Sequence, residues 1–350
     1  MYLFTVILLA SCSGSNNDDT PETPSGNNGN VTEWLVPVSE VKDGGPGKDG
    51  IPSIDNPIFI NASSQTFLSD NDLVIGIVKN NEVKAYPLSI LNWHEITNDD
   101  LNGELVTINF CPLTGTSFGW KSISNGTTTT FGVSGLLYNA NLILYDRNTN
   151  SYWSQIKLQC ISGDLIRDEP TLINVVETNW LTWKTLYPNT KVLSTDTGFS
   201  RNYGINPYSD YLASDNSFLF PFSPLNEALP FKERVYGIID DDKSKAYKFI
   251  SFVNGKVIQE SFNGKDYLVV GNKNLIQAFQ LTGDYLNLTF EYDFTGSEGF
   301  FKDNEGNIWS VFGEAISGSR MGETLAPVKS VVSYWFALAA FYPNPEIYSE

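Results

Sequence analysis

The sequence predicts an α+β protein dominated by strands, in which two related units follow each other along 350 residues. Three observations support this fold class. Short runs rich in β-branched and aromatic residues alternate with turn signals, aromatic residues make up 13% of the chain, and several short motifs occur twice. At roughly 100–200 residues per domain, the length also suggests two domains.

Composition excludes several classes of protein. The chain has 22 Lys and Arg against 40 Asp and Glu, a formal net charge of −18, so it lacks the cationic face that nucleic-acid binding requires. Its hydrophobic content of 41% is too high for a disordered chain. Three Cys cannot form a disulfide scaffold. The single His excludes metal sites that need two or more histidines.

The first twelve residues are predicted to be a lipoprotein signal peptide. Their apolar run is too short to span a bilayer, which takes about 20 residues, but it has the size of a signal-peptide core. It ends in Leu9-Ala10-Ser11-Cys12, which resembles a bacterial lipobox and implies cleavage before Cys12 and lipidation of its thiol. No Lys or Arg precedes the run, so the usual basic start is missing.

Residues 13–40 are predicted to be a disordered linker, because the stretch 13–31 is rich in Asn, Gly, Ser, Thr and Pro and lacks the apolar surface to fold. With the lipid at Cys12, this linker would tether a folded body to a membrane. We therefore expect a bacterial membrane-anchored lipoprotein that faces the periplasm or the cell surface.

The body begins with a predicted hairpin, since two β-rich runs at 73–79 and 83–87 flank Asn80-Asn81. Residues 180–186 have apolar residues at helical spacing, and Pro188 discourages continuation of this helix. Further strands are predicted at 104–110, 127–133, 142–145 and 191–194.

Repeated motifs indicate an internal duplication. Three motifs recur 161 residues later, among them Lys84-Ala85-Tyr86, which matches Lys245-Ala246-Tyr247. Three more recur 155 residues later, among them Tyr187-Pro188-Asn189, which matches Tyr342-Pro343-Asn344. We therefore predict a first unit at 41–194, a connector at 195–232 and a second unit at 233–350. The aromatic residues of the connector suggest that it packs on the body.

The most unusual segments belong to the first unit. The only His lies in Asn92-Trp93-His94-Glu95-Ile96, and the predicted strand at 104–110 ends at Cys111-Pro112-Leu113-Thr114-Gly115-Thr116. Side chains at such strand ends are positioned by the sheet and yet accessible, which favours chemistry. Tyr145-Asp146-Arg147 follows further along the chain.

These segments, with Asp49-Gly50-Ile51-Pro52-Ser53-Ile54-Asp55 and residues 131–139, resemble the bacterial domain-of-unknown-function 3179 family. The resemblance covers about residues 40–350. It implies little about activity, because the family has no established one. Some members have Cys-Pro-Leu-Cys where this chain has Cys111-Pro112-Leu113-Thr114, so a mechanism or metal site that uses the second Cys is not open here.

The second unit lacks the reactive residues. At the offset of 161, His94, Glu95 and Cys111 fall on Gly255, Lys256 and Asn272, and no His or Cys occurs anywhere in the second half. The register set by Trp153 and Trp309 places Lys302-Asp303 at Asp146-Arg147, so the order of charges is not kept. We predict one active unit and one degenerate, supporting unit.

Cys111 and His94 allow two kinds of chemistry. The imidazole can keep the thiol ionised as a nucleophile for acyl transfer or hydrolysis. Alternatively, thiolate and imidazole bind copper or zinc, with Met321 as a third ligand across the two units. We favour metal binding or redox chemistry, because an exposed catalytic thiolate outside the cytoplasm risks oxidation. Whether the chain is an enzyme stays open.

The sequence also leaves open which residue orients the His94 side chain. Glu95 is a poor candidate, because neighbours in a strand point to opposite faces. Asn98, Asp99 or Asp146 could serve instead.

Structural roles are the alternative for every candidate residue. Cys111 is then a buried apolar residue or the disulfide partner of Cys160, and His94 is a hydrogen-bonded core residue. Asp146 and Arg147 form an ion pair or a turn, unless Arg147 binds an anionic or carbonyl group. The protein would then be a non-enzymatic binding or scaffold module. Its expected partners are the membrane, through the lipid, and a small-molecule or metal ligand.

Overall fold

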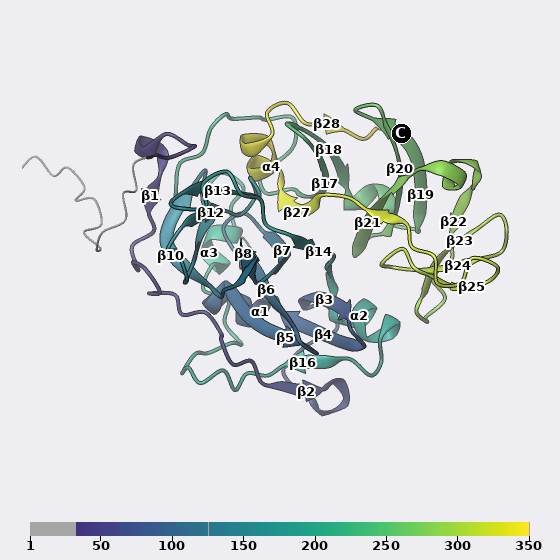
Figure 1. Cartoon of the computed structure of the whole chain (residues 1–350), viewed down its shortest axis with the longest axis horizontal. Coiled ribbons are helices and arrows are strands. Elements are labelled where there is room, and N and C mark those ends of the chain that lie inside the picture. Colours follow the sequence, from purple (N-terminus) through teal and green to yellow (C-terminus); the bar gives the residue numbers. More distant parts are fainter. Residues whose placement is uncertain (1–32, 125, 350) are drawn as a thin grey trace, which may run out of the picture. The chain divides into compact units, whose positions relative to one another are not determined.

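The computed structural model describes residues 33–124 and 126–349. The signal peptide and the lipidated Cys12 lie outside these residues and stay predictions. Within the described ranges, no helix is long and apolar enough to cross a membrane. Strands dominate, and the α-helices are short, so the predicted α+β class is confirmed (Figure 1). The helices are α1 (Leu88–His94), α2 (Trp180–Leu186), α3 (Ser209–Leu212) and α4 (Trp335–Phe341).

The first half of the chain forms three main sheets. One has the strand order β14 (Leu172–Ile173), β7 (Thr116–Lys121), β6 (Glu104–Cys111) and β5 (Ile96–Leu101). Another has the order β15 (Val176–Asn179), β3 (Leu73–Lys79), β4 (Glu82–Pro87), β16 (Lys191–Leu193) and β2 (Phe59–Asn61). The third has the order β1 (Lys42–Asp43), β10 (Phe131–Tyr138), β11 (Asn141–Asp146), β12 (Tyr152–Ser154) and β13 (Gln159–Ser162). β8 (Ile123–Ser124) and β9 (Thr127–Thr128) form a small ribbon.

The second half forms three sheets of similar design. One has the order β19 (Lys256–Phe262), β20 (Lys265–Asn272), β21 (Leu275–Leu281) and β26 (Ala326–Pro327). Another has the order β27 (Ser330–Tyr334), β17 (Arg234–Asp240), β18 (Lys243–Lys248) and β28 (Glu346–Ile347). The third has the order β22 (Phe290–Tyr292), β23 (Gly299–Asp303), β24 (Ile308–Ser310) and β25 (Ala315–Ser317). Short 3-10 helices are η1 (Val38–Glu40), η2 (Ala62–Ser64), η3 (Phe249–Phe252) and η4 (Gly283–Asn287).

The two halves use their repeated motifs in the same way. In the first half, Lys84 Nζ and Tyr86 Oη donate to the Asp99 carboxylate at 2.8 and 2.6 Å. In the second half, the Lys and Tyr of the repeated motif both donate to Glu260 at 2.7 Å. Such recurrence is what a duplication predicts, and the duplication itself stays a prediction.

Most elements of the first half follow the sequence prediction. β3 and β4 form the predicted hairpin, and Asn80 and Asn81 supply the positive φ angles of its turn, 49° and 63°. Helix α2 spans the predicted residues. The strand predicted at 127–133 is wrong, because the chain forms β9, leaves it, and enters β10 only at Phe131. The backbone of Thr129 and Thr130 bonds to Ser122 and Arg147 instead.

The connector packs on the body through its aromatic residues. Phe218 and Phe222 contact Phe336 of α4, with ring centroids 5.3 and 4.6 Å apart. Tyr211 donates to the carbonyl of Leu113 at 2.7 Å. The connector therefore covers the end of β6, close to Cys111.

The packing of helix α2 against strand β3 can be tested at a close contact. A Cβ atom on Gly76 of β3 would lie 2.2 Å from the Trp183 ring of α2, which is fully buried. We expect Gly76→Ala to lower the free energy of unfolding by at least about 2 kcal/mol through overpacking, measured by urea denaturation. Gly204→Ala, at an exposed position, is the control and should change it by less than about 0.5 kcal/mol. Equal stability of the two variants would contradict the packing.

Candidate functional site

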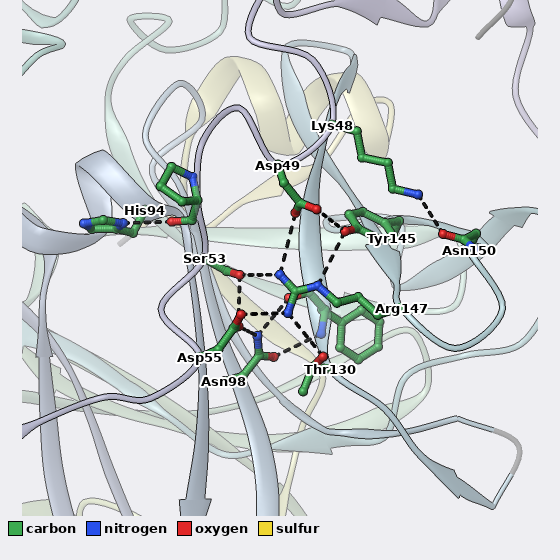
Figure 2. A network of polar contacts seen from close by, with 12 residues as sticks. Lys48, Asp49, Ser53, Asp55, His94, Asn98, Thr130, Tyr145, Arg147 and Asn150 are labelled. Atoms are coloured by element: carbon green, nitrogen blue, oxygen red, sulfur yellow. Dashed lines mark hydrogen bonds and ion pairs between the residues drawn. The ribbon is translucent and has the colours of Figure 1, made fainter. Parts of the chain in front are cut away.

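A strap, defined as residues 49–55, crosses the first half and is bound by Arg147 (Figure 2). Arg147 follows the last residue of β11. Its Nη1 donates to Asp55 at 2.9 Å, and its Nη2 donates to Ser53 at 2.8 Å and lies 3.6 Å from Asp49. Asn98 of β5 donates to the other oxygen of Asp55 at 2.7 Å. The strap is thus tied to two sheets.

The remaining donors of Arg147 are also engaged. Nη1 reaches Thr130 at 3.3 Å and Nε reaches Tyr145 at 3.5 Å, while Tyr145 donates to Asp49. The guanidinium therefore makes four hydrogen bonds and one longer ion-pair contact with Asp49. Two carboxylates offset its charge, so the structure shows Arg147 in an ion-pair role rather than with a free face for an anion.

His94 joins the strap to the connector. Its Nδ1 lies 2.8 Å from the Pro52 carbonyl and its Nε2 lies 2.6 Å from the Tyr203 hydroxyl. A carbonyl only accepts, so Nδ1 carries the proton and Tyr203 donates to Nε2. Thr197 then donates to Tyr203 at 2.5 Å. Burial lowers the pKa of His94, which favours this neutral form. Both ring nitrogens are occupied by structural partners.

Asp146 stabilises a turn. Its fully buried carboxylate accepts from the backbone of Thr149 and Ser151 at 2.8 and 3.2 Å and from the Trp153 indole at 3.3 Å. In the second half, Asp303 accepts from the Trp309 indole at 2.9 Å. Asp303, and not the Lys302 that the sequence register suggests, is therefore the counterpart of Asp146.

Cys111 is a buried thiol at the end of β6, 1% exposed. Cys111 and Cys160 are both free, so the disulfide considered from the sequence is wrong. Burial, reinforced by the charge of Glu95, raises the pKa of Cys111 to about 11, and the thiol is protonated at neutral pH. Within the described chain, no hydrogen bond joins Cys111 to His94.

Met321 differs from Cys111 and His94 in its solvent exposure. Its side chain is 73% exposed on the turn after β25, whereas Cys111 is buried. Among the residues that the structure describes, no group of three or more His, Cys, Asp and Glu is arranged to bind a metal ion. The metal site predicted from Cys111, His94 and Met321 stays a prediction.

Glu95 is the residue that sequence reasoning undervalued. It follows the last residue of α1 with φ 57° and ψ −32°, while its N–H bonds to Leu91 O at 2.7 Å. A positive φ is costly for a residue with a Cβ atom. In the second half, Gly255 adopts φ 80° before β19, where a glycine avoids that cost. The one signal in the sequence was that Glu95 directly follows His94, the position that aligns with Gly255 in the repeat.

Glu95 is mostly buried, and its carboxyl has no partner in the described chain. The residue is 7% exposed, and its side chain makes no hydrogen bond or ion pair to the rest of the described chain. Burial raises the pKa of Glu95 to about 8. An uncompensated buried carboxyl of this kind is unusual in a purely structural role.

The Glu95 carbonyl accepts from the backbone N–H of Phe110, next to Cys111 in β6, at 2.7 Å. Burial first, and then the charges of Glu95 and Cys111, raise the pKa of the Tyr208 phenol, and the charge of Glu95 also raises that of Cys111. Two residues before Cys111, on the same face of β6, Asn109 has a buried Nδ2 without a partner. The charge of Glu95 thus acts on both a thiol and a phenol, and we call these three residues, Glu95, Cys111 and Tyr208, the acid–thiol site.

The raised pKa of Glu95 predicts a pH dependence of stability. In the unfolded chain, the carboxyl ionises near its ordinary 4.5, whereas in the folded chain it stays protonated up to about 8. The folded state binds more protons in this window, so stability falls as pH rises from 4.5 through 8. We expect Glu95→Gln to remove this slope and to raise the free energy of unfolding at pH 9 by roughly 3 kcal/mol.

Urea denaturation at pH 4 and pH 9 measures this effect. Glu227→Gln, at an exposed position, is the matched control and should leave the slope as it is in the unmodified protein. An unchanged slope in Glu95→Gln would show that Glu95 is not the buried acid.

Comparison with known proteins shows to which family the chain belongs. The family model described as "Protein of unknown function (DUF3179)" matches residues 48–345, which confirms the resemblance seen in the motifs. No curated protein and no solved structure matches the chain. The match covers the strap, the acid–thiol site and both halves of the chain, and the protein belongs to the DUF3179 family.

Proposed function

We propose that this protein is a lipid-anchored protein of the cell envelope whose acid–thiol site performs Cys-dependent acyl transfer or hydrolysis. Cys111 is the nucleophile, and Glu95 accepts and returns its proton. The observation that carries the proposal is Glu95, which is 7% exposed, has a strained backbone and a carboxyl without a partner in the described chain, and raises the pKa of the free Cys111 thiol through its charge.

The chemistry requires a base matched to neutral pH. A carboxyl with a pKa near 8 is a stronger base than an ordinary carboxylate and still titrates close to the working pH. Ionised Glu95 takes the Sγ proton while the sulfur bonds to an acyl carbon. The leaving group departs with that proton, and water then hydrolyses the thioester with Glu95 again as base.

Glu95 suits this role better than His94. Both nitrogens of His94 are occupied by Pro52 and Tyr203, so its proton transfer would break a structural contact. Glu95 has no such contact to lose. Backbone strain at a residue that could have been glycine also points to function, since strain persists only where the surrounding structure imposes it.

The metal or redox role favoured by the sequence has weaker support. A metal ligand must be a thiolate, whereas burial keeps Cys111 protonated. His94 would have to release Tyr203 or Pro52 to offer a nitrogen. The acid–thiol pair needs neither change.

Acylation of Cys111 tests the proposal. Treated with p-nitrophenyl acetate at pH 8, the protein should release nitrophenol and carry an acetyl group on Cys111, detected by peptide mass spectrometry. Cys111→Ser should abolish the modification, and Glu95→Gln should slow it by about 100-fold, the usual contribution of a general base. Cys160→Ser, which removes the other described thiol, is the control and should react normally.

Equal acetylation of Cys111 with and without Glu95 would refute Glu95 as the base, and no acetylation at all would favour a non-enzymatic binding or scaffold module. One observation favours that second candidate. His94, Asp146 and Arg147 all have structural partners, as expected if the motifs mainly specify the fold.

The anchoring part of the proposal rests on Leu9-Ala10-Ser11-Cys12. Full-length protein made in a bacterial host should incorporate labelled palmitate and partition with the membrane. Cys12→Ala should lose both properties, while Cys160→Ser should keep them. Palmitate on the Cys12→Ala variant would contradict anchoring at this residue.

A further inference from the structure

A cavity of about 280 Å³ lies where the two halves of the chain meet. Four edge strands surround it. β14 and β15 each end a sheet of the first half, and β26 and β27 each end a sheet of the second half. β27 also contacts β7, and β15 contacts β21, so residues of both halves line the cavity.

The walls of the cavity are mostly apolar. Two chain segments that lead into β15 and β27 face it, and their side chains include Leu172, Val175, Pro327 and Val331. Its size is near the lower end of the roughly 300–1,000 Å³ typical of ligand pockets. Apolar walls with a few polar groups are the usual design of a small-molecule site.

Gln277 offers the cavity an unused acceptor. The residue is 5% exposed and lines the cavity from β21. Its Nε2 donates to the Val175 carbonyl at 3.2 Å, which fixes the side-chain amide. Its Oε1 accepts no hydrogen bond from the described chain. Because this oxygen is not sealed off from the cavity, an N–H or O–H group of a bound molecule can donate to it.

Glu177 is a second acceptor on the wall. Its carboxylate, 5% exposed, accepts from Ser117 Oγ and Arg234 Nη2, both at 2.7 Å. A carboxylate has about four lone-pair sites, so it can accept again. Arg234 offsets its charge. Lys329, the cation on the wall, is paired with Glu169 at 2.7 Å. Since the charges on the wall already have partners, the cavity favours a neutral ligand over a charged one.

We propose that this cavity binds a small neutral organic molecule with an apolar body and an N–H or O–H donor directed at Gln277 Oε1 and Glu177. The site is separate from the acid–thiol site, since neither Glu95 nor Cys111 lines the cavity. Binding here does not depend on the proposed acyl chemistry.

Benzamide is a suitable probe, because it joins a neutral amide donor to an apolar ring. N,N-dimethylbenzamide is the matched probe without a donor. Titrations of the full-length protein, followed by ligand-observed NMR, should show benzamide binding about five-fold or more tightly than the dimethyl form, the value of one hydrogen bond. Gln277→Leu should remove this preference, and Gln280→Leu, on the same strand but not lining the cavity, should keep it.

Val331→Phe tests the location by filling the cavity and should abolish benzamide binding. If that variant does not fold, the comparison of the two probes on Gln277→Leu and Gln280→Leu still decides. The proposal is overturned if benzamide does not bind, if the dimethyl form binds equally well, or if the preference survives in Gln277→Leu.

Discussion

The guanidinium of Arg147 is the interaction on which the geometry of the site depends. It binds Ser53 and Asp55 and so fixes the strap against β11 and β5. The strap in turn presents the Pro52 carbonyl to His94, the last residue of α1. Because Glu95 follows directly, its strained backbone is set by a helix end that the strap and the connector both bind. The contacts of Arg147 with the strap, which are partly exposed, therefore help to position the mostly buried Glu95.

Comparison of the two halves separates scaffold from site. Both halves keep the carboxylate that accepts from a Trp indole, and both keep the Lys-Ala-Tyr contact with a carboxylate. These contacts stabilise sheets and turns wherever they occur. The second half has Gly255 near the position of Glu95 and Asn272 at the end of β20, where the first half has Cys111 at the end of β6. A glycine thus avoids, in the second half, the strain that the first half retains at Glu95.

The sequence predicted the parts that depend on local chemistry. Asn80 and Asn81 favour positive φ, and Pro188 ends helix α2, so the hairpin and the helix could be placed correctly. It also identified Cys111 and its strand. It could not predict the role of Glu95. Whether a carboxyl lacks a partner depends on which residues surround it in the folded chain, and the sequence does not show them. The partners of Arg147 and His94 in the strap and the connector lie between 42 and 109 residues away in sequence, and no local pattern indicates such contacts.

Burial also answers the objection that a reactive thiol is at risk outside the cytoplasm. Oxidation acts on the thiolate and on accessible sulfur. Cys111 is 1% exposed and protonated, with its pKa raised to about 11. In the proposed mechanism, the Cys111 proton passes to ionised Glu95 as the sulfur attacks a carbonyl, so the thiolate need not exist at rest. The burial that argues against a standing metal thiolate is thus compatible with a nucleophile that is activated during the reaction.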